Sequence, residues 1–429
     1  MEKLFQLKEN GTTVRIEVIA GITTFLTMAY ILAVNPGILS EAGMPADSVF
    51  VATALASLIA TLVMAFVAKL PFALAPGMGL NAFFAFSVVL GMGYSWQFAL
   101  TAVFLEGIIF IILTMLNVRE AIINLIPQNI KKAISVGIGL FIAFIGMQNA
   151  GIIVDDPAVL VALGDFGSPA TLLAAIGLII IAVLNAFNIR GSLLWGILAA
   201  TIIGIPMGVT NVEGFSLFRT PPSLGPILLQ FDFAQVFTVD MLIILFTFLF
   251  VDMFDTVGTL IGVSTKAGMM QPDGSIPRAK QALLEDAVGT TVGAMLGTST
   301  VTTYVESAAG VEEGGRTGLT ALVVAILFFL SLFLSPLFLL VPAAATAPAL
   351  ILVGVFMMSP VREIEFGKIT EALPAFLTMI MMPLAYSIAE GIVFGLVSYV
   401  IIKLLSGKGK EVGVATYIVA LVLFLSFFV

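Results

Sequence analysis

Long apolar stretches with almost no charge run through this chain, and they restrict its fold more than any other feature. Stretches near the length that crosses a bilayer, about 17–25 residues, recur at residues 16–34, 50–66, 98–116, 133–152, 172–186, 193–209, 241–263, 320–340, 342–358, 372–385 and 391–405. Only 10% of the 429 residues are charged, against about 25% in a soluble domain. Such a chain cannot cover itself with a water-facing surface, so we predict an all-α polytopic membrane protein.

Three weaker stretches raise the predicted number of transmembrane segments to fourteen. They lie at residues 81–90, 283–296 and 297–315. With the N-terminus in the cytoplasm, Arg219 is the one loop Lys or Arg that falls outside, and acidic loops such as that of Asp155 and Asp156 fall outside too. This asymmetry follows the positive-inside rule and supports both orientation and count. A final apolar run, 415–429, is predicted either to lie in the interface or to make a partial span.

The second half of the chain repeats the pattern of the first. Segments 1–7 and 8–14 are each about 200 residues long, and because seven is odd the second half must enter the membrane inverted. Such repeats are typical of secondary transporters, whose sites lie near the midplane at discontinuous segments. The third segment of each half is interrupted. Pro76, Gly77 and Gly79 break the first, and the β-branched run 298–305 predicts extended backbone before a short helix in the second.

Two acids stand three residues apart inside the apolar eighth segment. Asp252 and Asp255 therefore share one face of a helix. An ionised acid at the bilayer centre costs about 2.5–3.5 kcal/mol, so it is tolerated where it meets water, a donor or a proton. We interpret the pair as a substrate and proton site, with Asp255 contacting the ligand and Asp252 orienting it or exchanging the proton. The alternative is a structural pair bonded to backbone N–H groups of the broken segments.

Each broken segment carries one further candidate. Glu306 would be held as an anion if a short helix begins near Ser307, ready to accept N–H groups of a neutral heterocycle; the alternative is a residue that only caps that helix. Asn81 can donate and accept at once, which suits a ligand with C=O and N–H side by side, although a structural role is also open. Residues 312–316 are predicted to form a cytoplasmic gate or cap.

The remaining candidates carry less specific signals. Glu106, in the fourth segment, either extends a proton path or bonds a neighbouring helix, and Phe83 and Phe25 are candidate rings for stacking on a ligand. The chain has no His, so proton coupling must run through carboxylates such as Asp252, Asp255 and Glu106. It has no Cys, which excludes thiolate sites, and we expect no cofactor or metal. A net charge of −8 argues against nucleic acid as a partner.

Four strings in order, residues 21–31 (GITTFLTMAYI), 75–84 (APGMGLNAFF), 251–259 (VDMFDTVGT) and 302–310 (TTYVESAAG), carry a family resemblance along nearly the whole chain. The sequence resembles the nucleobase–cation symporter-2 superfamily, and most closely its AzgA-like branch of adenine/guanine/hypoxanthine permeases. The resemblance implies fourteen helices in two inverted sevens, with short strands in segments 3 and 10 and the base bound between a core and a gate domain. It implies core at 1–118 and 240–340, gate at 119–212 and 341–429, and an extracytoplasmic linker at 213–239.

The resemblance also assigns residues. Asp255 stands where uracil and xanthine carriers have Glu, Glu306 is the acid of segment 10, and Asn81 is the amide of segment 3 in the purine branch. An Asp in place of Glu is one methylene shorter, which leaves room for a bicyclic purine or for Asp252 to share the task.

The expected function is a proton-coupled symporter that imports guanine and hypoxanthine, or adenine, across the inner cell membrane by alternating access; carriers of this architecture often form homodimers. A uracil or xanthine carrier remains open. A sulfate or bicarbonate carrier is disfavoured, because three acids without a matched Arg or Lys would repel an anion. An intramembrane aspartyl protease is disfavoured because its Gly-x-Gly-Asp context is absent. A passive channel would not need titratable acids.

Overall fold

The computed structural model describes residues 2–116, 127–269 and 278–425. In this part of the chain, nine helices are long and apolar enough to cross a membrane. They are Val14–Glu41, Ala46–Ala68, Trp96–Met115, Gln128–Asn149, Pro169–Ala186, Val239–Ser264, Gly318–Leu339, Ala343–Glu363 and Ile388–Leu405. Shorter apolar helices cover Met78–Gly91, Ser192–Gly204 and Ile369–Leu384. The chain is a multi-pass membrane protein, as predicted; the total of fourteen segments stays a prediction.

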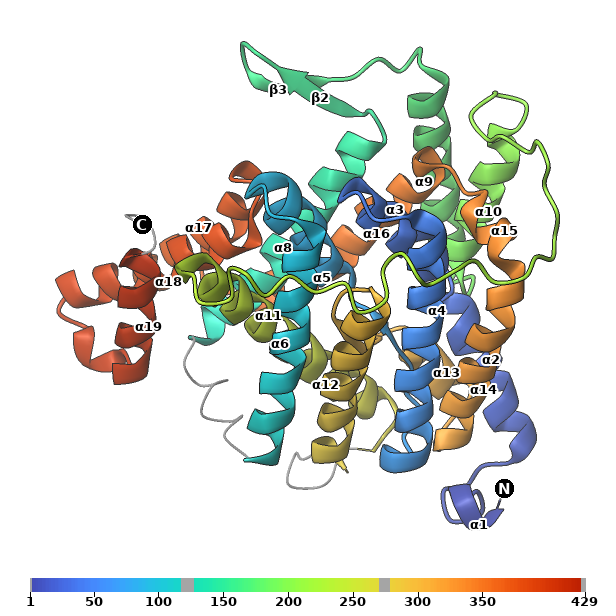
Figure 1. The fold of residues 1–429 in the computed structure, drawn as a ribbon. Helices are drawn as coiled ribbons and strands as arrows, with labels where there is room; N and C mark the ends of the chain where they lie inside the picture. The colour runs from blue at the N-terminus through green and yellow to red at the C-terminus, as the bar shows by residue number, and fades with distance from the viewer. Residues whose placement is uncertain (1, 117–126, 270–277, 426–429) are drawn as a thin grey trace.

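Figure 1 shows the elements in chain order. The first half contains α1 (Glu2–Phe5), α2 (Val14–Met28), α3 (Ile31–Glu41), α4 (Ala46–Val63), η1 (Met64–Ala68), β1 (Leu74–Pro76), α5 (Met78–Ala82), η2 (Phe83–Gly91), α6 (Trp96–Met115), α8 (Gln128–Asn149), β2 (Ile153–Asp156), β3 (Leu160–Leu163), α9 (Pro169–Ala186) and α10 (Ser192–Gly204). The second half contains α11 (Val239–Lys266), α12 (Ala279–Leu296), β4 (Val301–Thr303), α13 (Ser307–Glu312), α14 (Gly318–Ser331), η3 (Leu332–Leu334), α15 (Ser335–Leu339), α16 (Ala343–Met357), η4 (Ser359–Glu363), α17 (Ile369–Leu384), α18 (Ile388–Leu405), η5 (Gly409–Glu411) and α19 (Val414–Leu425).

The two broken segments meet as an antiparallel pair of strands. β1 pairs with β4 in the register Leu74↔Thr303, Ala75↔Thr302 and Pro76↔Val301. Each strand is followed by a short helix, α5 or α13, so the extended backbone expected in segments 3 and 10 is confirmed. Hydroxyl side chains form hydrogen bonds with backbone groups at the strand edges. For example, Thr61 Oγ1 accepts from Leu74 N–H at 3.0 Å. Such hydrogen bonds satisfy the polar groups of non-helical backbone inside an apolar protein.

The helices pack in two sets. In the first, α6 packs on α11 and α12, α4 on α12 and α14, and α2 on α13 and α14. In the second, α8 packs on α16 and α17, α9 on α10 and α16, and α17 on α18. Glycine permits the closest approach: a Cβ on Gly139 of α8 would stand 2.7 Å from the carbonyl oxygen of Gly354 of α16.

The linker from α10 to α11 has no helix or strand between residues 205 and 238. It crosses the first set of helices as the green trace of Figure 1. Ser48 Oγ of α4 donates to Ser223 O at 2.9 Å, and Asp232 N–H donates to Thr101 Oγ1 of α6 at 2.8 Å.

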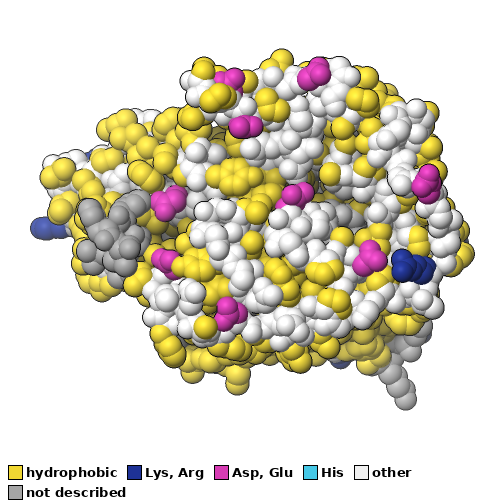
Figure 2. Space-filling view, turned by 45° about the horizontal axis from the view of Figure 1, so that its top comes forward, with side chains coloured by type: hydrophobic (Ala, Val, Ile, Leu, Met, Phe, Trp, Pro, Cys, Tyr) yellow, Lys and Arg dark blue, Asp and Glu magenta, His cyan; other side chains and the backbone are white. Residues whose placement is uncertain are grey.

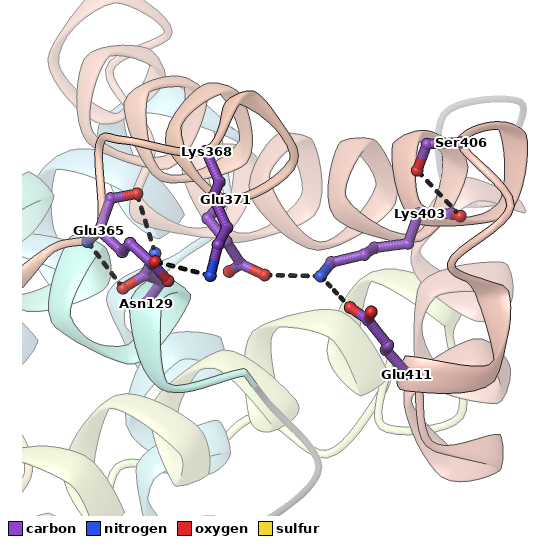
Figure 3. A network of polar contacts seen from close by, with 7 residues as sticks. All are labelled: Asn129, Glu365, Lys368, Glu371, Lys403, Ser406 and Glu411. Carbon is purple, nitrogen blue, oxygen red and sulfur yellow. Dashed lines mark hydrogen bonds and ion pairs between the residues drawn. The ribbon is translucent and has the colours of Figure 1, made fainter.

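A polar network ties α17, α18 and the turn before α19 (Figure 3). Lys403 of α18 forms ion pairs with Glu371 of α17 at 2.7 Å and with Glu411 of η5 at 2.6 Å. Nearby, Asn129 of α8 accepts from the Glu365 backbone N–H at 3.1 Å. Each charged group here has an opposite charge within reach, so the network holds these elements together.

Three local features differ from expectation. The β2–β3 hairpin was not predicted from its short, mixed sequence. The first predicted segment, 16–34, divides into α2 and α3 and continues to Glu41. The final run forms α19, whose twelve helical residues are about 18 Å long at 1.5 Å per residue, too short to cross a bilayer. Since α19 turns back on α18, the described part of this run does not span; residues 426–429 lie outside the described residues.

Candidate functional site

Helix α11 carries its two acids to the end of β4 and the start of α13. Thr302 Oγ1 of β4 donates to Asp255 Oδ2 at 3.5 Å. Glu306 stands at the N-cap position of α13, which begins at Ser307 as predicted. Its carboxylate makes no capping hydrogen bond. Instead the Tyr30 hydroxyl donates to Glu306 Oε1 at 2.7 Å. Glu306 thus occupies the cap position without capping the helix through its side chain, and its role in binding a ligand stays a prediction.

These two acids are not fully buried. Tyr304 and Thr302 are buried, Asp255 and Glu306 are partly exposed, and Val305 is 59% exposed. Asp255 and Glu306 lie close enough to act electrostatically on one another and on Tyr30. They are therefore candidates to contact the same ligand.

The fold places Asn81 beside the paired strands β1 and β4, but not beside Asp255 and Glu306. It is fully buried in α5, and the Ser299 hydroxyl donates to its side-chain oxygen. Its amide nitrogen has no hydrogen-bond partner in the part of the chain described. A buried amide with a spare donor costs free energy, so this group is available for a partner that reaches it.

A second group of acids lies deeper than Asp255. Asp252 of α11, Glu106 of α6 and Asp286 of α12 are all 0% exposed. Thr256 Oγ1 lies 3.3 Å from Asp252 Oδ1 and also within hydrogen-bonding distance of Asp286. The Thr300 hydroxyl donates to Glu106 Oε2 at 3.1 Å. We call Glu106, Asp252 and Asp286 the buried acid cluster.

Thr256 links two members of the buried acid cluster. Its hydroxyl lies within hydrogen-bonding distance of both Asp252 and Asp286 and has one hydrogen to donate. Glu106 is a close neighbour of Asp252. Ionised carboxylates repel one another at such short range, so the cluster is a candidate for holding a proton.

Sequence reasoning missed Asp286, Tyr30 and two structural acids. Asp286 and Glu285 lie in the weak segment 283–296, and two adjacent acids inside that apolar stretch were the available signal. Glu285 accepts from the Ala68 backbone N–H at 2.7 Å. Glu17 accepts from the N–H groups of three residues at the start of α14: Arg316, Thr317 and Thr320. The last two acids thus provide partners for backbone groups.

The aromatic candidates already have partners. Phe83 packs edge-to-face on Phe248 of α11, with ring centroids 4.8 Å apart. Phe25 of α2 packs in the same way on Phe328 of α14 at 5.3 Å. Phe83 is fully buried and Phe25 is partly exposed, so Phe25 is the ring with a free surface; a stacking role for either stays a prediction.

The predicted cap at 312–316 connects both sets of helices. Arg316 donates to the carbonyl oxygens of Val311 at 2.6 Å and Gly315 at 2.8 Å. Glu313, at the end of α13, forms an ion pair with Arg190 in the turn between α9 and α10. The short helix α13 thus bears Glu306 at one end and a contact with the second set of helices at the other.

The described residues offer no group of three or more His, Cys, Asp or Glu side chains arranged to hold a metal ion. The carboxyls found here instead face hydroxyl groups and one another.

The chain is similar to known permeases. A model described as "Permease family" matches residues 15–394. The adenine permease AdeP of Escherichia coli is 45% identical over 99% of this chain and 95% of its own length. The guanine/hypoxanthine permease PbuG of Bacillus subtilis is 47% identical over 96% of both chains.

A solved structure shares the fold. The transmembrane domain of the cyanobacterial bicarbonate transporter BicA superposes with a TM-score of 0.65 at 17% identity, covering 89% of this chain and 97% of that domain. At this identity the likeness concerns the fold alone. The family model spans most of the chain and the permease relatives align from end to end, so this chain belongs to the permease family and is a membrane transporter.

Proposed function

We propose that this chain is a proton-coupled symporter that imports purine nucleobases. The observation that carries the proposal is the pair of partly exposed acids, Asp255 and Glu306, at the β1–β4 crossing. Relatives named as adenine and guanine/hypoxanthine permeases support the substrate class. The inner cell membrane is the proposed location, and no cofactor is required.

The proposed substrate contacts follow from the chemistry of the acids. Tyr30 occupies Oε1 of Glu306, which leaves Oε2 to accept N–H groups from the edge of a purine. Asp255, close to Glu306, would accept a second N–H or the imidazole hydrogen. Asn81 would donate from its unpartnered amide nitrogen, and its oxygen would accept as well if the base displaced the Ser299 hydroxyl. An anion would meet these carboxylates with like charge, so the bicarbonate carrier remains the weaker candidate despite the shared fold.

The proposed proton site is the buried acid cluster together with Asp255. Asp252 lies one helical turn from Asp255 on the same face and within reach of Glu106. A proton arriving with the base would pass between Asp252 and Asp286 through the Thr256 hydroxyl. Neutralising one carboxyl removes part of the cost of carrying charge through the membrane.

We further propose that the two sets of helices are the moving parts. The first set would be the core domain (1–118 and 240–340) and the second the gate domain (119–212 and 341–429), with 213–239 as an extracytoplasmic linker. The Arg190–Glu313 ion pair joins them and would break and re-form as they move. Two chains would associate in a homodimer.

The proposed orientation has the N-terminus in the cytoplasm and fourteen segments in the membrane. Figure 2 supports the orientation, since the face that it brings forward bears scattered Asp and Glu side chains and little Lys or Arg. A face with few Lys or Arg side chains is expected away from the cytoplasm.

Uptake of labelled hypoxanthine by cells that express Glu306→Gln tests the site. We expect uptake to be lost, because Tyr30 would take the one amide oxygen and leave an NH2 group facing the N–H groups of the base, while the protein still reaches the membrane in normal amount. Glu213→Gln is the matched control, because it removes an exposed acid of the linker. Normal uptake by Glu306→Gln would contradict the site, and competition by unlabelled adenine, guanine, xanthine and uracil would rank the substrates.

A further inference from the structure

A broad apolar face of α14 and η3 points away from the protein. Ile326, Phe329, Leu330 and Phe333 are each between 40% and 49% exposed. Their spacing of three and four residues places them on one side of the helix. Apolar side chains exposed along a transmembrane helix contact lipid chains, so this face is a surface for the bilayer.

The linker builds a groove over the end of that face. The Arg219 backbone N–H donates to the carbonyl oxygen of Phe333 at 3.1 Å, which fixes the linker against η3. Phe218, beside it, is 70% exposed. Between linker and helix lies a cavity of about 670 Å³ lined by Phe218, Arg219, Thr220, Leu330, Phe333 and Leu334. In Figure 1 the linker passes α15 here.

The cation at the rim of the groove is weakly engaged. The Arg219 side chain is 59% exposed, and Asp47, the acid that pairs with it, stands 3.9 Å away and is 54% exposed. An ion pair of this length between exposed groups contributes little. Arg219 is also the one basic loop residue that the charge pattern places outside. A guanidinium at the end of an apolar groove, on a face otherwise rich in acids, is suited to a phosphate group.

We propose that this groove binds an anionic phospholipid of the outer leaflet. The phosphate lies on the Arg219 guanidinium, where it displaces Asp47, and an acyl chain lies along Phe218, Leu330 and Phe333. The lipid joins the linker to α14 of the first helix set, so it stabilises the outer end of the molecule. This site shares no residue with the candidate site at Asp255 and Glu306 and does not depend on what the protein transports.

Thermal unfolding of the purified full chain in detergent tests the site. Dioleoyl-phosphatidylglycerol and dioleoyl-phosphatidylcholine are added in parallel, because they share their acyl chains and differ in headgroup charge. We expect phosphatidylglycerol to raise the unfolding midpoint of the wild type well above the value reached with phosphatidylcholine. Arg219→Gln should abolish that difference, Arg219→Lys should keep part of it, and Lys410→Gln, an exposed charge elsewhere, should keep all of it.

Asp47→Asn separates lipid binding from a purely structural ion pair. If Asp47 competes with the phosphate, its removal should make phosphatidylglycerol act at lower concentration. Equal effects of the two lipids on the wild type, or a full phosphatidylglycerol effect on Arg219→Gln, would overturn the proposal. So would loss of the effect in Asp47→Asn, or an equal shift with inorganic phosphate alone, since neither fits a lipid held by Arg219.

Discussion

Two groups of carboxylates in this protein differ in their partners: one group forms ion pairs with a lysine, and the other accepts hydrogen bonds from hydroxyl groups. Glu371 and Glu411 share Lys403, so their charge is matched in the folded protein (Figure 3). Asp255, Glu306 and Glu106 receive hydroxyl groups from Thr302, Tyr30 and Thr300. A carboxylate that has a lysine is held in one charge state, whereas one that has a hydroxyl can gain or lose a proton. The first arrangement holds helices together, and the second can respond to a ligand.

The largest expected effect comes from neutralising one acid of each kind. Asp252→Asn keeps the shape of the buried acid cluster but removes a proton carrier, so we expect accumulation of hypoxanthine against its gradient to be abolished. Glu371→Gln should lower stability and leave accumulation per folded molecule near normal. Both are measured as uptake normalised to folded protein. Coupled uptake by Asp252→Asn would show that the two kinds of acid do not differ in this way.

Lys403→Met is expected to have the largest effect on stability. The Lys403 side chain is 5% exposed, and removal of one member of a buried ion pair costs about 3–5 kcal/mol. The unfolding midpoint in detergent should fall accordingly, while Lys408→Met, at an exposed lysine in the turn after α18, should change it little. A midpoint unchanged in Lys403→Met would mean that the network of Figure 3 is not structural.

Tyr30→Phe should weaken substrate binding without loss of fold. A hydrogen bond to a charged group contributes about 1.5–3 kcal/mol, so the apparent affinity for the base should drop by about 10–100-fold. Tyr304→Phe is the matched control, because its hydroxyl donates to the Pro76 carbonyl at 2.6 Å and not to an acid. Equal affinity losses in the two variants would remove the special role of Tyr30.

The smallest expected effect is on the pH dependence of stability, and it arises in the ion-pair network of Figure 3. Lys403 holds the pKa of Glu411 below its usual range. A lowered pKa in the folded protein means that the contribution to stability is full above the ordinary carboxyl pKa, about 4.3, and is lost as the pH falls through the lowered value. Glu411→Gln should flatten this part of the stability profile. An unchanged acid limb would show that Glu411 does not contribute to it.

How far the sequence predicted the molecule depends on the range of the interaction. Pro76 and the run 298–305 predicted both broken segments, because backbone conformation depends largely on the residue types nearby in the sequence. The start of α13 at Ser307 followed for the same reason. The partner of Glu306 could not be predicted, since Tyr30 lies 276 positions away and only the packing of α2 on α13 brings it near.

Asp286 is a second residue whose role could not be predicted from the sequence. It belongs to a helix with a weak apolar signal, so an acid there looked ordinary until burial placed it beside Thr256 and Thr303. The hairpin β2–β3 was missed because its pairing depends on a turn and not on a periodic pattern. Asp252 and Asp255 were found because charge inside an apolar run is visible in the sequence itself.

The central claim is that hydroxyl-partnered acids carry a proton together with the base. Proteoliposomes containing wild type or Asp252→Asn, with a pH-sensitive dye inside, test it directly when hypoxanthine is added outside. The account predicts acidification of the lumen with the wild type that depends on hypoxanthine, and none with Asp252→Asn although hypoxanthine still exchanges. Hypoxanthine entry into wild-type vesicles without a proton signal would contradict it.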